Sequence, residues 1–158
     1  MRRKDREITE EKEILAILQK SKVMHLACCK DNMPYVIPLN FAYEYENGQL
    51  ALFFHCANEG KKLDILKQNP HVAFAINCDH RLLTADEACG YGYAFSSLMG
   101  EAAAEIINSP AEKARLLSLL LWQQAQKEFS LNPAHLQGVT LCRLNVSALS
   151  AKKCTKVD

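Results

Sequence analysis

Two adjacent lysines, Lys61 and Lys62, follow Gly60 at the start of a predicted helix. The apolar run 53–55 before them is typical of a strand end. The first N–H groups of a helix have no acceptor within the helix, and the helix dipole is positive there, so this end can bind an anion. Two ammonium groups slightly oppose the dipole, so helix stability does not explain them. The pattern indicates a phosphate-binding turn; the alternative is a solvated first turn.

His55, at the end of that strand, is the candidate catalytic residue. An imidazole changes its charge near neutral pH and could donate a proton or a hydrogen bond to a reacting substrate. The alternative is a histidine that only hydrogen-bonds backbone or a bound ligand. Cys56 and Cys89 are candidate redox-active thiols, with inert packing as the alternative. The remaining histidines show no metal-ligand spacing, and no metal site is predicted: His25, His71, His80 and His135.

The 158 residues predict one domain, 1–158, with a hydrophobic fraction of 49% and a charged fraction of 23%. A formal net charge of +1 provides no field that would attract nucleic acid. No apolar run is long enough to span a membrane. The seven cysteines include no C-x-x-C pair, and no secretory signal core follows the basic start. Free thiols in a reducing cytoplasm are therefore expected.

Apolar residues alternate with others from Tyr35 to Tyr45, which predicts one half-buried strand that ends at a hairpin turn, Asn47-Gly48. Pro34 and Pro38 cannot donate to a β-ladder, so part of this strand is expected at a sheet edge. The free N–H and C=O groups of such an edge could hydrogen-bond a flat heterocycle.

Further strands are predicted at 49–55, 71–78, 91–107 and 138–148. Residues 79–90 are predicted as a loop, and 150–158 as a polar tail. Ser109-Pro110 begins a helix whose leucine band is wide enough to predict burial on two sides, for example at a subunit interface. Consecutive hairpins favour an antiparallel sheet, so we expect a mainly β fold, a small barrel with peripheral helices. Edge strands of an open barrel favour dimerisation.

Five segments in order resemble the nitroimidazole-resistance (Nim-type) branch of the pyridoxamine 5′-phosphate oxidase-like flavoproteins. They are Pro34–Phe41, Phe54–Ala57, Gly60–Lys62, Asn69–Val72 and Phe95–Gly100. The similarity runs in register from about Val23 to Gly100, and Cys89 stands where this branch often has a cysteine. The resemblance implies an FMN-binding split β-barrel, antiparallel and Greek-key-like, in a homodimer with two flavin sites at its interface.

By the same resemblance, the edge strand runs beside the isoalloxazine ring, the lysines hold the flavin phosphate and a serine contributes from the sheet. The implied cofactor-binding set is Val36, Ile37, Pro38, Leu39, Asn40, Phe54, His55, Cys56, Ala57, Lys61, Lys62 and Ser97. The chain departs from the family pattern at His25, where arginine is common, at Cys56, where glycine is common, and at Leu98, where valine is usual.

The resemblance implies an FMN-dependent oxidoreductase. Such an enzyme passes electrons from a nicotinamide cofactor or another donor to a small organic acceptor, such as a nitroaromatic compound. The alternative is a module of the same fold that stores or senses flavin or haem without turnover. Neither nucleic acid nor a membrane is expected as a partner.

Overall fold

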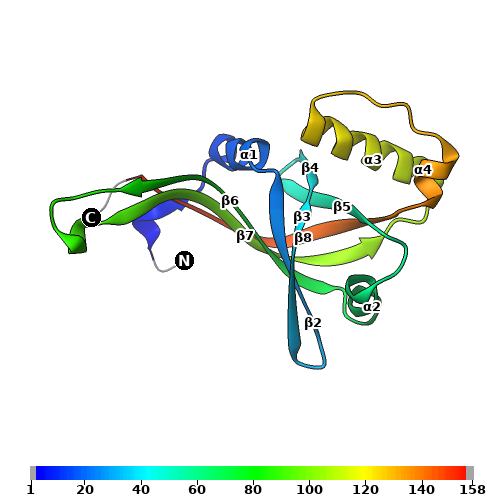
Figure 1. Ribbon diagram of the computed structural model, residues 1–158, viewed down its shortest axis with the longest axis horizontal. Coiled ribbons are helices and arrows are strands. Elements are labelled where there is room, and N and C mark those ends of the chain that lie inside the picture. The colour runs from blue at the N-terminus through cyan, green and yellow to red at the C-terminus, as the bar shows by residue number, and fades with distance from the viewer. Residues whose placement is uncertain (1–2, 156–158) are drawn as a thin grey trace.

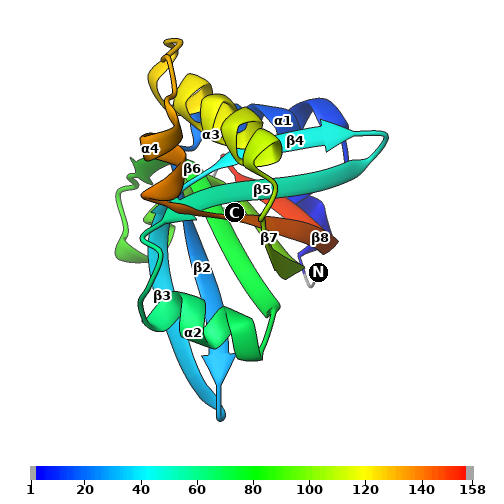
Figure 2. The ribbon, with the colours of Figure 1, turned by 90° about the vertical axis from the view of Figure 1, so that its right-hand side faces the viewer.

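One antiparallel sheet of eight strands forms the centre of the computed structural model, which describes residues 3–155. In chain order the strands are β1 Glu7–Ile8, β2 Val23–Lys30, β3 Met33–Asn40, β4 Ala42–Glu46, β5 Gln49–Cys56, β6 His71–Leu83, β7 Gly92–Ile106 and β8 Thr140–Cys154. Their order across the sheet is β3-β2-β6-β7-β8-β5-β4, and β1 pairs with β8. The sheet curls into an open barrel (Figures 1 and 2), so the predicted mainly β, antiparallel fold is confirmed.

The helices lie at the periphery of this sheet. They are α1 Glu11–Lys20, α2 Lys61–Gln68, α3 Pro110–Ala125 and α4 Pro133–Gln137, with short 3₁₀ turns at Lys4–Arg6 and Ala88–Gly90. Figure 1 shows α3 over β4 and β5, and α2 beside β2 at the other end of the barrel. No helix among residues 3–155 is both long and apolar enough to cross a bilayer. The cytoplasmic location stays a prediction.

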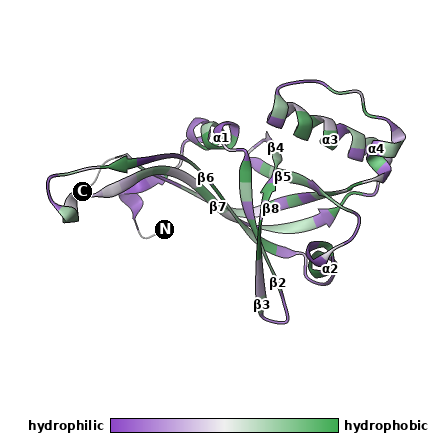
Figure 3. Cartoon of the chain, viewed as in Figure 1, coloured by the Kyte–Doolittle hydropathy of each residue, from purple (hydrophilic) through white to green (hydrophobic). Residues whose placement is uncertain are grey.

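The barrel interior is filled by alternate residues of the central strands. Large apolar residues alternate with small or polar ones along β2 and β6, and the large residues are the buried ones; Figure 3 colours the strands by hydropathy. The fully buried side chains of β2, β6 and β7 include Met24, Leu26, Ile76 and Leu98. Because side chains of a strand alternate between faces, the other face of the same strands points away from this core.

The barrel is split at Phe41. The sequence predicts one strand from Tyr35 to Tyr45, and this prediction is wrong: β3 pairs with β2, β4 pairs with β5, and β3 and β4 form the two ends of the sheet. Phe41 is buried, and its carbonyl oxygen accepts a 2.6 Å hydrogen bond from the Gln124 amide of α3. A helix, rather than a neighbouring strand, therefore holds the chain at the break.

The exposed edge of β4 is covered by α3. The side-chain amide of Gln123 accepts a hydrogen bond from the Tyr43 N–H at 2.9 Å and donates one to the Tyr43 carbonyl oxygen at 2.8 Å. This exchange copies the pair of hydrogen bonds that a neighbouring strand would make. One glutamine thus satisfies an edge that would otherwise be open.

The hairpin formed by β6 and β7 extends beyond the barrel as an arm (Figure 1). The sequence predicts a loop from residue 79, but β6 continues to Leu83. A register shift between Cys78 and Arg81, with Asp79 in the left-handed region at φ 60°, lets the ladder resume. Lys20 and Ser96 each donate a 3.0 Å hydrogen bond to the Asp79 carboxylate. The polar sequence at the shift hides the strand, because a bulge resembles a loop in sequence.

The C-terminal segment also differs from the prediction. Up to Cys154 it is part of β8 and pairs with β7, for example Lys152 with Ser97; residues 156–158 lie outside the described residues. The helix start predicted at Ser109-Pro110 is confirmed by the hydrogen bond that the Ser109 hydroxyl accepts from the Glu112 N–H. The ladder between β7 and β8 shifts its register between Glu101 and Ala102.

Candidate functional site

The N-terminus of α2 is open towards the split of the barrel. Gly60 precedes the helix at φ 129°, a conformation that is largely restricted to glycine, and no described side chain caps the helix there. The Lys61 ammonium lies 4.5 Å from the centre of the Tyr35 ring of β3. The Lys62 ammonium lies 5.2 Å from the centre of the Phe54 ring of β5. The two cations therefore reach the two strands on either side of the split.

Neither lysine makes a salt bridge with another residue of the described chain. Two adjacent ammonium groups and an open helix N-terminus together form a positive end without an anionic partner there. This arrangement suits a dianion such as a phosphate ester, which would receive charge-assisted hydrogen bonds from both groups.

Lys62 also acts on the titratable groups at the end of β5. Partial burial lowers the pKa of His55, and the nearby Lys62 ammonium lowers it further. The imidazole is therefore mainly neutral at pH 7, and it is exposed to solvent. It points to the opposite face of β5 from Phe54 and Cys56, because adjacent residues of a strand alternate.

β3 has one free edge, so the edge position predicted from Pro34 and Pro38 is confirmed. Ile37 and Leu39 pack against the barrel core, while the residues that alternate with them, Val36, Pro38 and Asn40, are exposed. The Asn40 amide donates a 3.0 Å hydrogen bond to the Lys22 carbonyl oxygen, which fixes the end of the strand.

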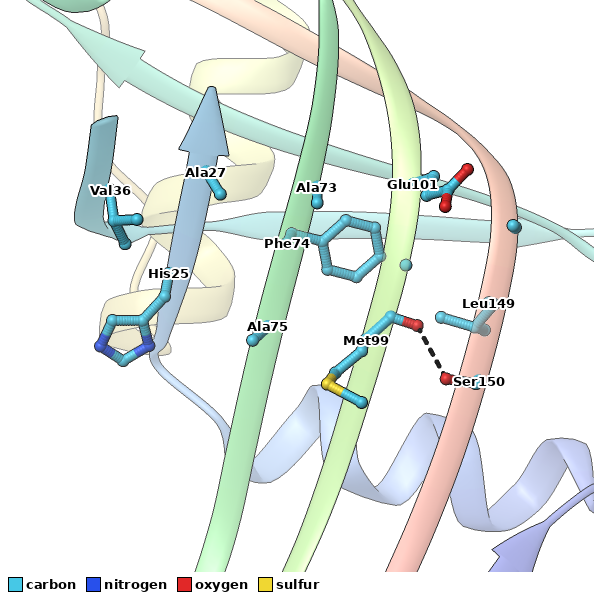
Figure 4. A pocket seen from close by; sticks show the side chains of 12 residues that line it. His25, Ala27, Val36, Ala73, Phe74, Ala75, Met99, Glu101, Leu149 and Ser150 are labelled. Carbon is cyan, nitrogen blue, oxygen red and sulfur yellow. Dashed lines mark hydrogen bonds between the residues drawn. The ribbon is translucent and has the colours of Figure 1, made fainter. Parts of the chain in front are cut away.

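The outer face of the sheet carries a shallow cavity of about 490 Å³ (Figure 4). Four neighbouring strands and β3 contribute mostly small side chains to it: Val36, His25, Ala27, Ala73, Ala75, Met99, Glu101, Ala148 and Ser150. Val36 is 58% exposed and Met99 47%, so apolar surface remains open to solvent. His25, where the family commonly has arginine, lies at the edge of this cavity.

A second cavity of about 410 Å³ adjoins the first and contains Ser97. The Ser97 hydroxyl is buried and has no hydrogen-bond partner within residues 3–155. Asn77 and Lys152 also line the cavity, and the Lys152 ammonium lies 5.3 Å from the centre of the Phe95 ring. An orphan hydroxyl beside a cation and an amide is a suitable contact for a bound polar group.

The structure does not bring Ser97 to the lysines of the same chain. Burial raises the pKa of Cys28, and both lysines are close enough to oppose this effect. Cys28 pairs with Val72 of β6, whereas Ser97 pairs with Asn77 of the same strand. Five residues of β6 separate these pairs, which at a rise of about 3.3 Å per residue is roughly 17 Å. The predicted phosphate site is thus in two parts that are far apart on one chain.

Sequence reasoning missed several residues near these parts. The sequence predicts a polar tail around Lys152, and it places Tyr35 in an alternating strand and in a family segment without giving it a role of its own. Cys142 carries no local signal, because its neighbour Cys56 is brought to it by the long-range pairing of β5 with β8. Cys89 lies exposed in the arm, and its thiol contacts the Glu87 carboxylate at 3.6 Å. Among the described residues, no group of three or more histidine, cysteine or acidic side chains could hold a metal ion.

A family model described as pyridoxamine 5′-phosphate oxidase matches residues 10–153. The chain belongs to this family. The family predicted from the five sequence segments is thereby confirmed, whereas its nitroimidazole-resistance branch stays a prediction. Among curated proteins, the chain is 28% identical over 69 residues to the uncharacterized protein RA0666 of Rhizobium meliloti. That match covers 44% of this chain and spans 42% of the length of the relative.

Solved structures with the same fold include proteins that hold redox cofactors. A candidate 5-nitroimidazole antibiotic resistance protein from Bacteroides thetaiotaomicron has a TM-score of 0.81 and 24% identity, covering 93% of this chain and 86% of its own. The flavocytochrome Anf3 from Azotobacter vinelandii has a TM-score of 0.80 and 19% identity, and the match covers 98% of this chain and 72% of that protein. An FAD- and haem-binding protein from Mycobacterium smegmatis has a TM-score of 0.79 and 17% identity, and the match covers 97% of this chain and 76% of that protein.

The residues present fit a flavin with a phosphate tail. Lys61 and Lys62 supply cations without an anionic partner among the described residues, beside an open helix end. The Ser97 hydroxyl is a buried polar group without a described partner. The free edge of β3 supplies backbone groups of the kind that a heterocyclic ring can hydrogen-bond. The cofactor-binding residues predicted from the sequence stay a prediction, as does the catalytic role of His55.

Proposed function

We propose that the protein is an FMN-dependent oxidoreductase. Electrons enter from a nicotinamide cofactor or another donor and leave to a small organic acceptor, such as a nitroaromatic compound. The observation that carries the proposal is the pair of ammonium groups at the open N-terminus of α2, beside the free edge of β3, in a chain of the pyridoxamine 5′-phosphate oxidase family. Bound flavin would supply the two-electron redox chemistry.

The roles of the chain's own residues follow from their positions. Lys61 and Lys62 would bind the phosphate, and the backbone of Val36–Asn40 would orient the ring along the strand edge. His55 is mainly neutral at pH 7, so it could donate a hydrogen bond through one ring nitrogen or accept a proton at the other. The Tyr35 and Phe54 rings, each beside one ammonium group, would help to position the two lysines.

We further propose that the site is completed by a second copy of the chain. The strand pair near the lysines, Cys28 with Val72, and the pair that contains Ser97 are separated by roughly 17 Å along β6. The open outer face, with its small side chains and exposed Val36 and Met99, would be covered in a homodimer. Pairing two such faces could bring the Ser97 cavity of one protomer to the lysines of the other. The homodimer predicted from the sequence is thus part of the proposal.

An absorption spectrum of the purified protein tests the cofactor. We expect a flavin band near 450 nm after addition of FMN, and bleaching by NADH or NADPH followed by reoxidation with a nitro compound. Protein that stays colourless with both FMN and FAD would contradict the proposal. Mass spectrometry of the released cofactor distinguishes FMN from FAD, the flavin that the descriptions of two structures with the same fold name.

Two variants test the phosphate contact. A hydrogen bond to a charged group contributes about 1.5–3 kcal/mol, so Lys62→Met should weaken FMN binding by about 10- to 100-fold. Riboflavin, which lacks the phosphate, is the matched control, and its affinity should not change. Ser97→Ala should leave the stability of the unliganded chain unchanged or slightly higher, because the hydroxyl has no described partner, yet weaken FMN binding. Equal losses for riboflavin and FMN would contradict the phosphate assignment.

The alternative is a non-catalytic module that stores or senses flavin or haem. It is favoured by the likeness in fold to a flavocytochrome and to an FAD- and haem-binding protein. Flavin that binds but is reduced by no nicotinamide donor would support this alternative, and a Soret band after addition of haem would identify haem as the ligand. Full reductase activity in His55→Ala would remove the catalytic role of His55.

A further inference from the structure

Two free cysteines from adjacent strands meet beside Lys62. Cys56 is the last residue of β5 and is half-buried, whereas Cys142 on β8 is completely buried. In the register of these strands Phe54 pairs with Cys142, so Cys56 lies diagonally across from Cys142 on the same face. Both side chains pack in the core cluster of the barrel, and Cys142 is close enough for its thiol to act as a hydrogen-bond donor to a Cys56 thiolate.

The surroundings give the two thiols different roles. The hydrogen bond from Cys142 lowers the pKa of Cys56 to about 7, and the Lys62 ammonium contributes to this although burial opposes it. The same hydrogen bond and burial raise the pKa of Cys142. Cys142 from β8 and Lys62 from α2 are the charged or titratable groups that act on Cys56 within the described chain. The accessible thiol is therefore the acidic one, and the buried thiol keeps its proton.

Cys28 provides an internal contrast, because it is also near Lys61 and Lys62. Its thiol donates to the Tyr35 carbonyl oxygen at 3.6 Å, and it is buried. Burial raises the pKa of Cys28 more than the lysines lower it. Proximity to the lysines alone thus does not make a thiol acidic; Cys56 differs from Cys28 in having the thiol of Cys142 beside it.

We propose that Cys56 and Cys142 form a peroxide-sensitive dithiol, in which Cys56 is the reactive thiolate and Cys142 is the resolving thiol. Redox-sensing cysteines are commonly acidic, accessible and placed next to a resolving cysteine, and this pair combines those features. The proposal concerns oxidation of the chain itself and does not depend on the proposed flavin chemistry.

The chemistry balances with a hydroperoxide as the only oxidant. The Cys56 thiolate attacks the outer peroxide oxygen, the O–O bond breaks, and the leaving alkoxide or hydroxide takes a proton from water. The resulting sulfenic acid then reacts with the Cys142 thiol, which forms the disulfide and releases its proton with the hydroxyl group as water. Two small thiols reverse the reaction by exchange.

Closure requires a small local movement. Diagonal neighbours on antiparallel strands are about 7–8 Å apart, slightly beyond the usual Cα separation in a disulfide. Cys56 ends β5 and is followed by the exposed turn 57–60, so this end of the strand can shift towards β8. Oxidation also removes the negative charge that faces Lys62.

Alkylation kinetics test the reactive thiolate. The protein as purified, in a Cys89→Ser background, is treated with iodoacetamide between pH 5 and 10, and each cysteine is followed by mass spectrometry. We expect half-maximal reaction of Cys56 near pH 7 and, at pH 7, a rate about tenfold or more above that of Cys28. Lys62→Met should move the Cys56 midpoint upward, whereas Lys61→Met, which removes the same charge beside Tyr35, should not. A Cys56 midpoint at or above pH 8.5 overturns the proposal.

Peptide mapping tests the resolving step. After brief treatment with hydrogen peroxide, we expect one non-reduced peptide pair that joins Cys56 to Cys142 and is released by dithiothreitol. In Cys142→Ala, Cys56 should instead accumulate as a sulfenic acid that dimedone traps. If Cys142→Ala does not fold, the peptide map of the oxidised wild-type protein is sufficient to test the proposal. Oxidation that leaves Cys56 unmodified, or that joins it to any cysteine other than Cys142, overturns the proposal. A protein that forms the Cys56–Cys142 disulfide but binds no flavin contradicts only the flavin assignment.

Discussion

The two faces of the strands β2, β6 and β7 differ in what covers them. On the inner face, Phe74 is 3% exposed and Leu98 is fully buried; on the outer face, Met99 beside Leu98 is 47% exposed. Successive side chains of each strand point alternately to the inner and the outer face. Large side chains therefore fill the barrel from one side, while alanines and a methionine leave the other side open.

The difference indicates which part of the sequence specifies the fold of one chain and which part is available for another task. Inner-face residues contact one another and are already packed. Outer-face residues border a cavity of about 490 Å³ that their small side chains leave unfilled. Substitutions on the two faces should therefore affect different properties, even at neighbouring positions of one strand.

The largest effect is expected from Phe74→Ala, which removes a buried aromatic ring from the inner face. Such truncations cost about 3–5 kcal/mol of unfolding free energy, because transfer energy is lost and a cavity remains. Val36→Ala on the outer face, where the side chain is 58% exposed, is the control and should change stability by less than about 0.5 kcal/mol. Urea unfolding measures both, and similar losses would contradict the division between the faces.

A smaller but clear loss is expected from Gly100→Ala. The added Cβ would lie 2.5 Å from the Ala148 carbonyl oxygen and 2.6 Å from the Phe74 ring, both too close without rearrangement. We expect a cost of about 1–3 kcal/mol, as for other overpacked sites. Gly138→Ala is the control, because its added Cβ would make only an ordinary contact, at 3.5 Å from the Ala134 carbonyl oxygen. Thermal unfolding that ranks Gly138→Ala as the more harmful would show that the close approach at Gly100 is tolerated.

Ala75→Glu tests the outer face directly. A carboxylate there should change the stability of the single chain by less than about 0.5 kcal/mol, because the site borders the open cavity. The same change should abolish the proposed homodimer, since burial of an unpaired charge is unfavourable. Analytical ultracentrifugation measures association; a dimer of undiminished affinity would locate its interface elsewhere.

The smallest effect concerns the arm, at Asp79. Lys20 and other hydrogen-bond donors lower the pKa of the Asp79 carboxyl below 3.8, so folding stabilises the carboxylate. That contribution is present above about pH 4 and is lost as the pH falls through the folded-state pKa. Because the pair is exposed, Asp79→Asn should cost only about 0.5 kcal/mol at pH 7, and less near pH 3. Urea unfolding of both proteins at pH 7 and pH 3 measures the difference, and equal losses at the two pH values would contradict this role of the carboxylate.

Much of the fold could be predicted from local patterns. Alternation placed most of the strands, the prolines of β3 placed an edge, and Ser109-Pro110 placed the start of α3. The break at Phe41 could not be predicted, because the apolar alternation continues through it and the cause is a glutamine more than 80 positions away. The extension of β6 was hidden by Asp79, whose left-handed backbone restores the ladder after a polar stretch.

The candidate site could be predicted only where it is contiguous in sequence. Lys61 and Lys62 follow Gly60 in one short segment, so their position at a helix start could be predicted from the sequence. The distance between these lysines and Ser97 depends on the pairing of β2, β6 and β7, which no local pattern contains. The contact between Cys56 and Cys142 depends in the same way on the register of β5 and β8.

The side-chain amide of Gln123 allows α3 to block edge-to-edge association through β4. An unpaired strand edge can recruit the same strand from another molecule and grow into fibrils. Here a single side chain occupies both backbone groups of Tyr43 and leaves an incoming strand nothing to hydrogen-bond at that residue. Gln123→Leu, which removes this pair of hydrogen bonds and leaves every strand in place, should therefore promote aggregation through β4.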